Sequence, residues 1–343
     1  MVGVVPELQI GRRLGSGHFG VVFLGQDVVH GQVAVKVLAR KPTQSDAEWQ
    51  VFKTGFLAEA QNLSKATHRN VVQVYHIEEL PDGNSIRFCM AYCPGGSLQS
   101  AFETGPKTLP TVRKAGTEVL MGLAALHARQ MLHRDIKPGN ILIDAAGVAQ
   151  IGDFGLVTDD LMFGYGSQAG YSDHIAYEVW QGGGTSAKSD IWALGMTLFR
   201  LIHGKQWYEE APDPQTIIPN GGFAGTLKWL PHVPKSWRRC IRKMMNDDPA
   251  SRYQTASQAL EALSRLPITP VWSAAVAADL VRWEQTTQTR RIMVEWKRLS
   301  PRKHKWMAWS EPLGRGRKMT LAGSGGIVGS RQAVTELKAY FGD

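Results

Sequence analysis

The chain has 343 residues, of which 43% are hydrophobic and 20% are charged. This length exceeds one typical domain, and the composition is that of a globular protein, which excludes disordered and fibrous classes. Cys89, Cys93 and Cys240 cannot form a disulfide framework and show no zinc-ligand spacing, so we expect buried free thiols in a reducing, cytoplasmic compartment. We expect no signal peptide and no membrane span, because no run reaches about 18 uninterrupted apolar residues.

The formal net charge of +9 is unevenly distributed along the chain. Residues 268–343 contain 13 Lys and Arg but only 6 Asp and Glu, a net charge of +7 that leaves +2 for the rest. The basic character therefore belongs to the C-terminal segment, where it predicts an acidic partner surface.

Residues 8–40 alternate strand-like runs with glycine turns. Within them, five residues fit the pattern G-x-G-x-x-G-x-V: Gly15, Ser16, Gly17, Gly20 and Val22. The glycines alone are a weak signal, because dinucleotide-binding folds use the same spacing. Here a strand containing Ala34 and Lys36 follows, where a dinucleotide-binding fold would place a helix. The glycines would let the backbone approach nucleotide phosphates and Lys36 would supply a positive charge; a surface lysine at a strand end is the alternative.

The next segments predict a helix, two strands and a second helix. Apolar residues recur at three- and four-residue steps over 45–66, and again over 111–130. Strands are expected at 71–78 and 85–92, joined by a turn at 81–84.

A polar cluster follows at residues 133–144, surrounded by an apolar run typical of strands, which predicts a loop between a helix and a β-hairpin. Asp135 and Asn140 lie five residues apart, and Asp153 lies thirteen residues beyond Asn140. One carboxylate could face a substrate hydroxyl while an amide and a second carboxylate hold Mg²⁺ on a nucleotide.

This ordered set resembles the catalytic loop and magnesium motif of protein kinases, most closely those of bacterial eukaryotic-like serine/threonine kinases. The resemblance covers about residues 8–266 and implies an α+β fold of two lobes. The N-lobe, 8–92, would be an antiparallel sheet with one helix, and the C-lobe, 94–266, would be mainly helical. Residues 271–343 would form a small basic α+β appendix of unknown role.

The resemblance implies a role for each residue of the loop. Asp135 would accept or orient the substrate hydroxyl proton, and Lys137 would stabilise the transferring phosphoryl group. Asn140 and Asp153 would hold Mg²⁺, with Mn²⁺ as the alternative. Glu59 would orient Lys36 by an ion pair, with Glu48 as the competing candidate.

The resemblance also implies a set of residues that bind ATP, with Met90 as gatekeeper and the segment after it as the hinge. These residues are Gly15, Ser16, Gly17, Gly20, Val22, Ala34, Lys36, Met90, Ala91, Tyr92, Cys93, Leu142, Asn140 and Asp153.

In the C-lobe, the resemblance implies that Glu178 pairs with Arg252 and that Asp190 braces the catalytic loop backbone. Two positions depart from the family pattern. Tyr177 replaces a proline, and Tyr171 stands where a threonine is expected, so the hydroxyl that bridges the catalytic Asp and Lys is either that of Ser172 or missing.

These residues predict a serine/threonine protein kinase that acts on protein substrates and autophosphorylates. The alternative is a nucleotide-binding pseudokinase, a scaffold whose C-terminal domain recruits a partner or nucleic acid. A small-molecule kinase is the third hypothesis; the landmarks around Glu178 and Asp190 argue against it.

The C-terminal segment predicts a helix at 272–286, three strands near 290–298, 304–310 and 316–322, and a last helix at 330–341. This order resembles a double-stranded RNA-binding domain, although Arg331 alone supplies a basic start to the last helix. A basic-aromatic cluster is formed by Trp296, Lys297, Arg298, Arg302, Lys303, His304, Lys305 and Trp306. A nucleic-acid surface and a protein- or lobe-docking surface are both open; we expect docking, with the tryptophans buried.

Overall fold

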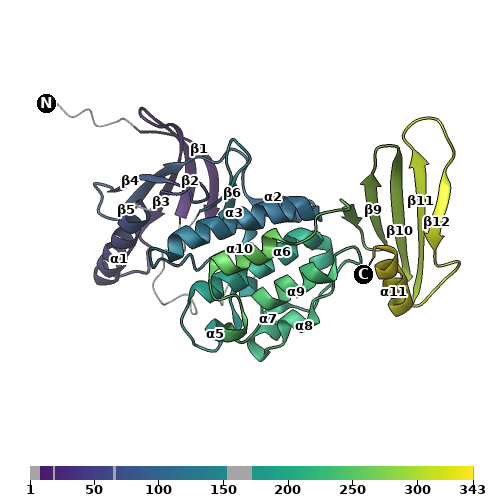
Figure 1. Cartoon of the computed structure of the whole chain (residues 1–343). Helices are drawn as coiled ribbons and strands as arrows, with labels where there is room; N and C mark the ends of the chain where they lie inside the picture. Colours follow the sequence, from purple (N-terminus) through teal and green to yellow (C-terminus); the bar gives the residue numbers. More distant parts are fainter. Residues whose placement is uncertain (1–7, 18–19, 65–66, 153–171, 343) are drawn as a thin grey trace.

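The computed structural model describes residues 8–17, 20–64, 67–152 and 172–342. Three bodies lie in a row, with a large helical body between two smaller bodies that each contain a sheet and one helix (Figure 1). We name them the N-lobe, the C-lobe and the C-terminal domain, after the predicted ranges 8–92, 94–266 and 271–343. The predicted two-lobed fold with a C-terminal appendix is confirmed.

The N-lobe is an antiparallel sheet of five strands in the order β1-β2-β3-β5-β4, with one helix. The elements are β1 (Gln9–Gly17), β2 (Gly20–Asp27), β3 (Gly31–Ala39), α1 (Asp46–Ser64), β4 (Val74–Glu79) and β5 (Ser85–Ala91).

Helix α1 covers one face of this sheet. Residues directly opposite each other on paired strands share a face, and Lys36 lies opposite Phe88 while Leu38 lies opposite Ile86. Trp49 of α1 packs against Leu38, Ile86 and Phe88. The helix therefore lies on the face that carries Lys36.

The C-lobe consists of helices and one small hairpin, β6–β7. Its elements are α2 (Leu98–Glu103), α3 (Leu109–His127), β6 (Ile141–Ile143), β7 (Ala149–Ile151), α5 (Tyr177–Trp180), α6 (Ala187–Tyr208), α7 (Pro214–Ile217), α8 (Phe223–Thr226), α9 (Lys235–Met244) and α10 (Ala256–Ser264).

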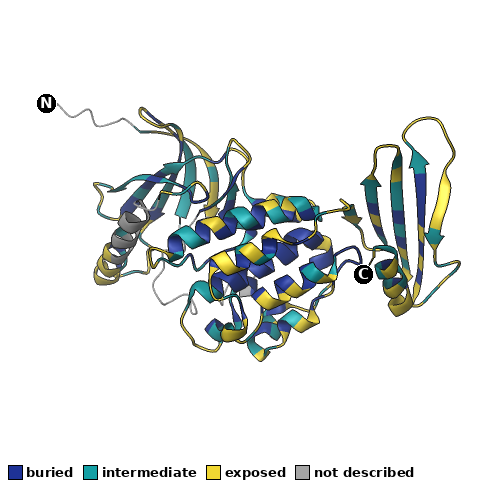
Figure 2. Ribbon diagram, in the orientation of Figure 1, coloured by how far each residue is buried: buried dark blue, intermediate teal, exposed yellow. Residues whose placement is uncertain are grey.

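Helix α6 forms the centre of the C-lobe. Every residue from Ser189 to Gly204 is buried, and Figure 2 shows the dark blue of buried residues at the centre of this lobe. A helix that is buried on all sides is covered by its neighbours, and here α2, α3 and α9 pack around it. This core fixes the position of any polar group that α6 presents to the rest of the lobe.

The C-terminal domain is a five-stranded antiparallel sheet in the order β12-β11-β10-β9-β8, followed by a helix. Its elements are β8 (Ser273–Val276), β9 (Leu280–Thr286), β10 (Arg290–Ser300), β11 (Lys303–Pro312), β12 (Met319–Gly323) and α11 (Ser330–Tyr340).

The predicted helix at 272–286 is wrong, because this segment forms the β8–β9 hairpin. Its alanines favour a helix locally, but Val281 and Trp283 alternate with exposed or half-buried residues and pair with β10. Strand pairing and burial override the propensity of the isolated segment. The domain therefore lacks the first helix on which the likeness to a double-stranded RNA-binding domain depended.

One face of this sheet is apolar and buries most of the aromatic side chains, as predicted. Buried residues on the sheet include Val281, Trp283, Val294, Trp296, Trp306 and Ala308, and α11 contributes Ala333 and Leu337. The predicted basic-aromatic cluster is therefore divided, because Trp296, His304 and Trp306 are buried while Lys297, Lys303 and Lys305 are exposed.

Arg298 joins the C-terminal domain to the C-lobe. Its guanidinium donates two hydrogen bonds to the Glu210 carboxylate, at 2.6 and 2.8 Å. It also lies over the rings of Trp207 and Trp296, at 5.6 and 5.9 Å from their centroids. A bidentate pair shielded by two aromatic rings favours a fixed docking geometry.

His232 forms a second junction between the two bodies. The Trp283 indole N–H donates to Nδ1 of His232 at 2.9 Å, and both side chains are buried. Burial lowers the pKa of His232 to about 3. The imidazole is therefore neutral, which allows Nδ1 to accept the hydrogen bond.

We expect acid to weaken the protein through His232. Its folded pKa lies below the value of about 6.5 in the unfolded chain, so the contribution to stability is complete above pH 6.5 and is lost as the pH falls toward 3. The loss should be about 1.4 kcal/mol per pH unit. Urea unfolding between pH 7 and 5 should show a shallower pH dependence for His232→Asn, whose side-chain oxygen can still accept from Trp283. An unchanged slope in this variant would contradict the assignment.

Among the helices that the structure describes, none is long and apolar enough to cross a membrane.

Candidate active site

The loop with Asp135 lies between α3 and the β6–β7 hairpin, as predicted. Arg134 in this loop has a φ of +67°, a left-handed conformation that non-glycine residues seldom adopt. Such a conformation persists only where the surrounding contacts hold it.

Asp190 of α6 supplies those contacts. Its carboxylate accepts hydrogen bonds from the backbone N–H of His133 at 3.0 Å and of Arg134 at 2.8 Å. A third bond, at 2.9 Å, joins the carboxylate to Nε2 of His127 at the end of α3. The expected bracing of the loop by Asp190 is confirmed. Sequence reasoning missed His127, which stands where the helix ends, a position that favours a basic side chain.

His133 connects the loop to the segment that precedes Asp153. Its Nδ1 accepts from the backbone N–H of Asp135 at 3.3 Å, so Nε2 carries the proton and donates to the Gly152 carbonyl at 3.1 Å. The Gly152 N–H in turn donates to the Asn140 carbonyl at 2.9 Å. These bonds bring the loop, β6 and the end of β7 together.

Asp135, Lys137 and Asn140 form one contact group. Oδ2 of Asp135 accepts from Lys137 Nζ at 2.8 Å and from Asn140 Nδ2 at 2.7 Å. The same amide nitrogen of Asn140 donates to the Asp135 carbonyl at 2.8 Å. The carboxylate is thus held by two donors within a largely buried loop, where Asp135 is 9% exposed.

In the N-lobe, four of the predicted ATP-binding residues share one face of the sheet. Lys36 lies opposite Val22, and Ala34 lies opposite Met90. Since Ala34 and Lys36 are two residues apart on β3, all four side chains are on the face that α1 partly covers.

The glycine pattern forms the end of the β1–β2 hairpin, where Gly15 pairs with Val22 and Gly17 pairs with Gly20. Gly20 has a φ of +138°, and a Cβ there would lie 2.2 Å from the Val37 carbonyl oxygen. The backbone at this position therefore requires glycine. Ser16 lies in the same hairpin and is exposed.

Of the two candidate partners of Lys36, Glu48 and Glu59, the structure shows Glu48 bonded to another residue. The carboxylate of Glu48 accepts from both the N–H and the hydroxyl of Ser45, at 2.8 and 2.7 Å, which is a capping box at the start of α1. Both bonds lower the pKa of Glu48, and the bond from the Ser45 hydroxyl has the larger effect. Glu59 lies farther along the same helix, on a backbone that the structure describes, and its pairing with Lys36 stays a prediction.

The predicted hinge leads from β5 into the C-lobe beside β6. After Met90 and Ala91, which end the strand, come Tyr92 and the buried Cys93. Two backbone hydrogen bonds then fix the linker against β6, the strand that carries Leu142. The Gly95 N–H donates to the Ile143 carbonyl, and the Ile143 N–H donates to the Gly96 carbonyl.

Burial raises the pKa of the Cys93 thiol in this hinge to about 11.

A buried ion pair fixes the short helix α5, which follows the undescribed residues 153–171 in the sequence. The guanidinium of Arg252 donates to Glu178 at 2.8 and 2.5 Å, and the Arg252 side chain is fully buried. The expected pair is confirmed, and replacement of proline by Tyr177 leaves it intact.

Asp153, the second predicted metal ligand, and Tyr171, the departure from the family pattern, lie outside the described residues, as do the side chains of Glu59 and Ser172.

Comparison with known proteins identifies the family. The model for the protein kinase domain matches residues 8–263. The chain belongs to the protein kinase family. The matched range contains both lobes of the kinase domain and ends before the C-terminal domain.

Curated relatives include kinases of bacteria and animals. The serine/threonine-protein kinase PrkC of Bacillus subtilis is 32% identical over 255 residues, which is 72% of this chain and 38% of that protein. The DNA damage-responsive serine/threonine-protein kinase RqkA of Deinococcus radiodurans is 30% identical over 240 residues, 63% of this chain and 35% of that protein. The Aurora/IPL1-related protein kinase 2 of Caenorhabditis briggsae is 30% identical over 251 residues, 72% of this chain and 80% of that protein.

We expect Asp190→Asn to lower the kcat of the kinase domain by about tenfold or more while the KM for ATP changes little. The amide offers one acceptor oxygen in place of two, so at least one of the three N–H donors loses its partner, at a cost of about 1–3 kcal/mol. Steady-state kinetics and urea unfolding measure the two effects.

Thr197→Val is the matched control, because it removes from the same helix a buried hydroxyl that donates to the Ala193 carbonyl within α6. This variant should lose some stability and keep its kcat. Equal loss of kcat per folded molecule in both variants would contradict the proposed role of Asp190.

Proposed function

We propose that this chain is a serine/threonine protein kinase that transfers the γ-phosphoryl group of ATP to protein Ser and Thr hydroxyls, including its own. The observation that supports this most strongly is the group formed by Asp135, Lys137 and Asn140. A carboxylate held by a lysine and an amide can accept a proton from an alcohol, while the ammonium group stabilises charge on the phosphoryl oxygens. Lys137, two residues after the aspartate, favours Ser and Thr over Tyr as acceptors.

A protein kinase domain implies use of ATP and a divalent metal ion. Asn140 fits the metal, because its amide nitrogen is used on Asp135 and its oxygen remains as a hard ligand. We propose that Asn140 and Asp153 hold Mg²⁺, or Mn²⁺ in its place. When bound, the ion would neutralise charge on the nucleotide phosphates.

We propose that ATP lies against the N-lobe face that carries Val22, Ala34, Lys36 and Met90, with Leu142 on the C-lobe side. The sharing of one face by these side chains supports the assignment. Lys36 would pair with the phosphates and be oriented by Glu59, since α1 covers this face. The backbone of Ala91, Tyr92 and Cys93 would contact the adenine.

The pseudokinase alternative is disfavoured, because Asp135, Lys137, Asn140 and Lys36 are all present and the curated relatives are kinases. A small-molecule kinase would phosphorylate metabolites and no polypeptide. The three buried free thiols support a reducing, cytoplasmic location.

We expect Asp135→Asn to lower phosphoryl transfer by about 100-fold or more, because the amide cannot accept the substrate proton. Nucleotide affinity should change by less than about twofold, since the carboxylate acts on the hydroxyl and not on ATP. Transfer of labelled phosphate and nucleotide titration measure the two quantities separately.

Asp213→Asn, at the exposed start of α7, is the control for loss of one carboxylate. It should keep wild-type turnover. Near-wild-type turnover in purified Asp135→Asn would remove Asp135 from its role.

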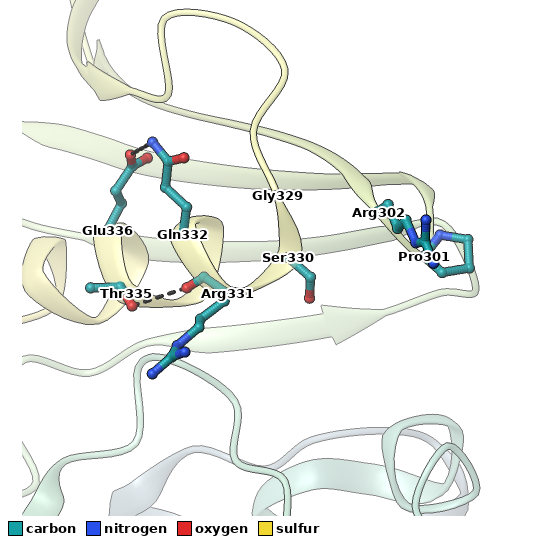
Figure 3. A pocket seen from close by; sticks show the side chains of 8 residues that line it. All are labelled: Pro301, Arg302, Gly329, Ser330, Arg331, Gln332, Thr335 and Glu336. Atoms are coloured by element: carbon teal, nitrogen blue, oxygen red, sulfur yellow. Dashed lines mark hydrogen bonds between the residues drawn. The ribbon is translucent and has the colours of Figure 1, made fainter.

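We further propose that the exposed face of the C-terminal domain binds an acidic protein. Lys297 and Lys305 lie directly opposite each other on β10 and β11, an arrangement of like charges that destabilises a sheet in isolation. Arg302 and Arg331 line a cavity of about 610 Å³ between the β10–β11 turn and the start of α11 (Figure 3), at the side of the sheet that α11 covers, so the two lysines form a separate basic site on the other face. An acidic partner would relieve the repulsion between the two lysines.

Nucleic acid is the other candidate for this face, and salt distinguishes the two. Binding of the full chain to duplex DNA or RNA should be weak; tight binding that falls steeply with salt and is lost in Lys297→Glu/Lys305→Glu would favour nucleic acid over protein. Lys228→Glu/Lys235→Glu, at two exposed positions of the C-lobe, is the control that makes the same change in net charge.

A further inference from the structure

Three side chains that bind metals in other proteins lie together on the N-lobe sheet. Asp27 ends β2, His76 is on β4, and Cys89 is on β5. One ligand atom from each, an oxygen, a nitrogen and a sulfur, lies within 4.8 Å of the other two. In tetrahedral zinc sites such atoms are about 3.4–3.8 Å apart, so shifts of about 1 Å would place all three around one ion.

The cluster is distinct from the nucleotide site. Cys89 lies opposite Val35 on β3, and Val35 is adjacent in sequence to Lys36, so the thiol faces the side of the sheet away from α1. Val33, Val35 and Cys89 form a separate apolar cluster there, with Tyr75 packed against it. The inference therefore does not depend on the proposed kinase activity.

Asp27 offers a carboxylate whose position is already fixed by hydrogen bonds. Its side chain is 1% exposed, and a buried carboxylate is costly unless a positive charge or several donors compensate it. Two backbone N–H groups and Nδ1 of His30, at 2.9 Å, compensate the carboxylate, so it can stay ionised and serve as an anionic ligand. His76 is only half-buried, which leaves an approach for an ion.

The hydrogen bonds of Asp27 leave one oxygen for a metal. Oδ1 accepts from the backbone N–H of Val29 at 2.9 Å, from that of His30 at 2.8 Å, and from Nδ1 of His30 at 2.9 Å. Oδ2 receives none of these bonds. The His30 ring also stacks on Tyr75, with centroids 3.9 Å apart, which holds the β2–β3 turn over β4.

We propose that Asp27, His76 and Cys89 bind one divalent cation, with zinc the best match, and that His30 positions the Asp27 carboxylate. Thiolate and imidazole ligands select zinc over Mg²⁺, which prefers oxygen ligands. On binding, the Cys89 thiol releases its proton to solvent and a sulfur–metal bond forms. A water molecule supplies the fourth ligand, and the ion cross-links β2, β4 and β5.

The test is metal analysis of the full-length protein after incubation with Zn²⁺ and dialysis against metal-free buffer. We expect one equivalent of zinc in the wild-type protein and less than about a tenth in Cys89→Ser and His76→Gln. His30→Ala should keep the site and lose about tenfold in affinity, as partners of metal ligands do. Zinc at 100 times its Kd should raise the wild-type melting temperature by about 5 °C and leave that of His76→Gln unchanged.

Co²⁺ in place of Zn²⁺ identifies the ligand, because a bound thiolate gives a charge-transfer absorption band that the oxygen ligands of the nucleotide site cannot give. The band should appear in wild type, His30→Ala and the control Cys240→Ser, which removes a buried thiol of the C-lobe. It should be absent in Cys89→Ser. If Cys89→Ser does not fold, the half-buried His76→Gln decides alone. Absence of zinc in folded wild-type protein, or as much zinc in the two ligand variants as in wild type, would overturn the proposal.

Discussion

The buried carboxylate of Asp190 is the interaction on which the active-site geometry depends. It lies at the start of the most buried helix and accepts three hydrogen bonds from two other segments. Arg134 can hold a left-handed conformation because its N–H is fixed there, and this turn directs Asp135 toward Lys137 and Asn140. Because α6 is tightly packed, it holds Asp190 in place, and Asp190 in turn fixes the loop that carries Asp135, Lys137 and Asn140.

Further contacts fix the segments around this loop and the C-terminal domain. His133 connects the loop to Gly152, which places the loop beside the segment leading to Asp153. The Arg252–Glu178 pair ties α5 to the segment that precedes α10 in the C-lobe. At the far side of that lobe, Arg298 and His232 hold the C-terminal domain. A partner of that domain would thus bind to a surface fixed on the kinase domain and not to a free tail.

Residues whose roles follow from neighbours in the sequence were the easiest to predict. Asp190 and the Glu178–Arg252 pair belong to ordered motifs, and the structure gives these residues the expected contacts, while the roles predicted for Asp135, Lys137 and Asn140 stay predictions. The prediction of a helix at 272–286 was wrong because its alanines favour a helix locally. The segment instead forms strands, since Trp283 pairs with β10, a contact that the local sequence does not reveal. Contacts between residues far apart in the sequence also could not be predicted. These include the Asp27–His76–Cys89 cluster, whose members lie on three different strands, and the Arg298–Glu210 pair.

The proposed function is transfer of the γ-phosphoryl group of ATP to Ser and Thr hydroxyls of proteins, catalysed at the loop that carries Asp135. The most direct measurement is incubation of the purified chain with radiolabelled ATP, Mg²⁺ and a general protein substrate, followed by acid hydrolysis and separation of the phosphoamino acids. The account predicts label in phosphoserine and phosphothreonine. Label confined to phosphotyrosine, or no label in any polypeptide despite Mg²⁺-dependent ATP binding, would contradict it.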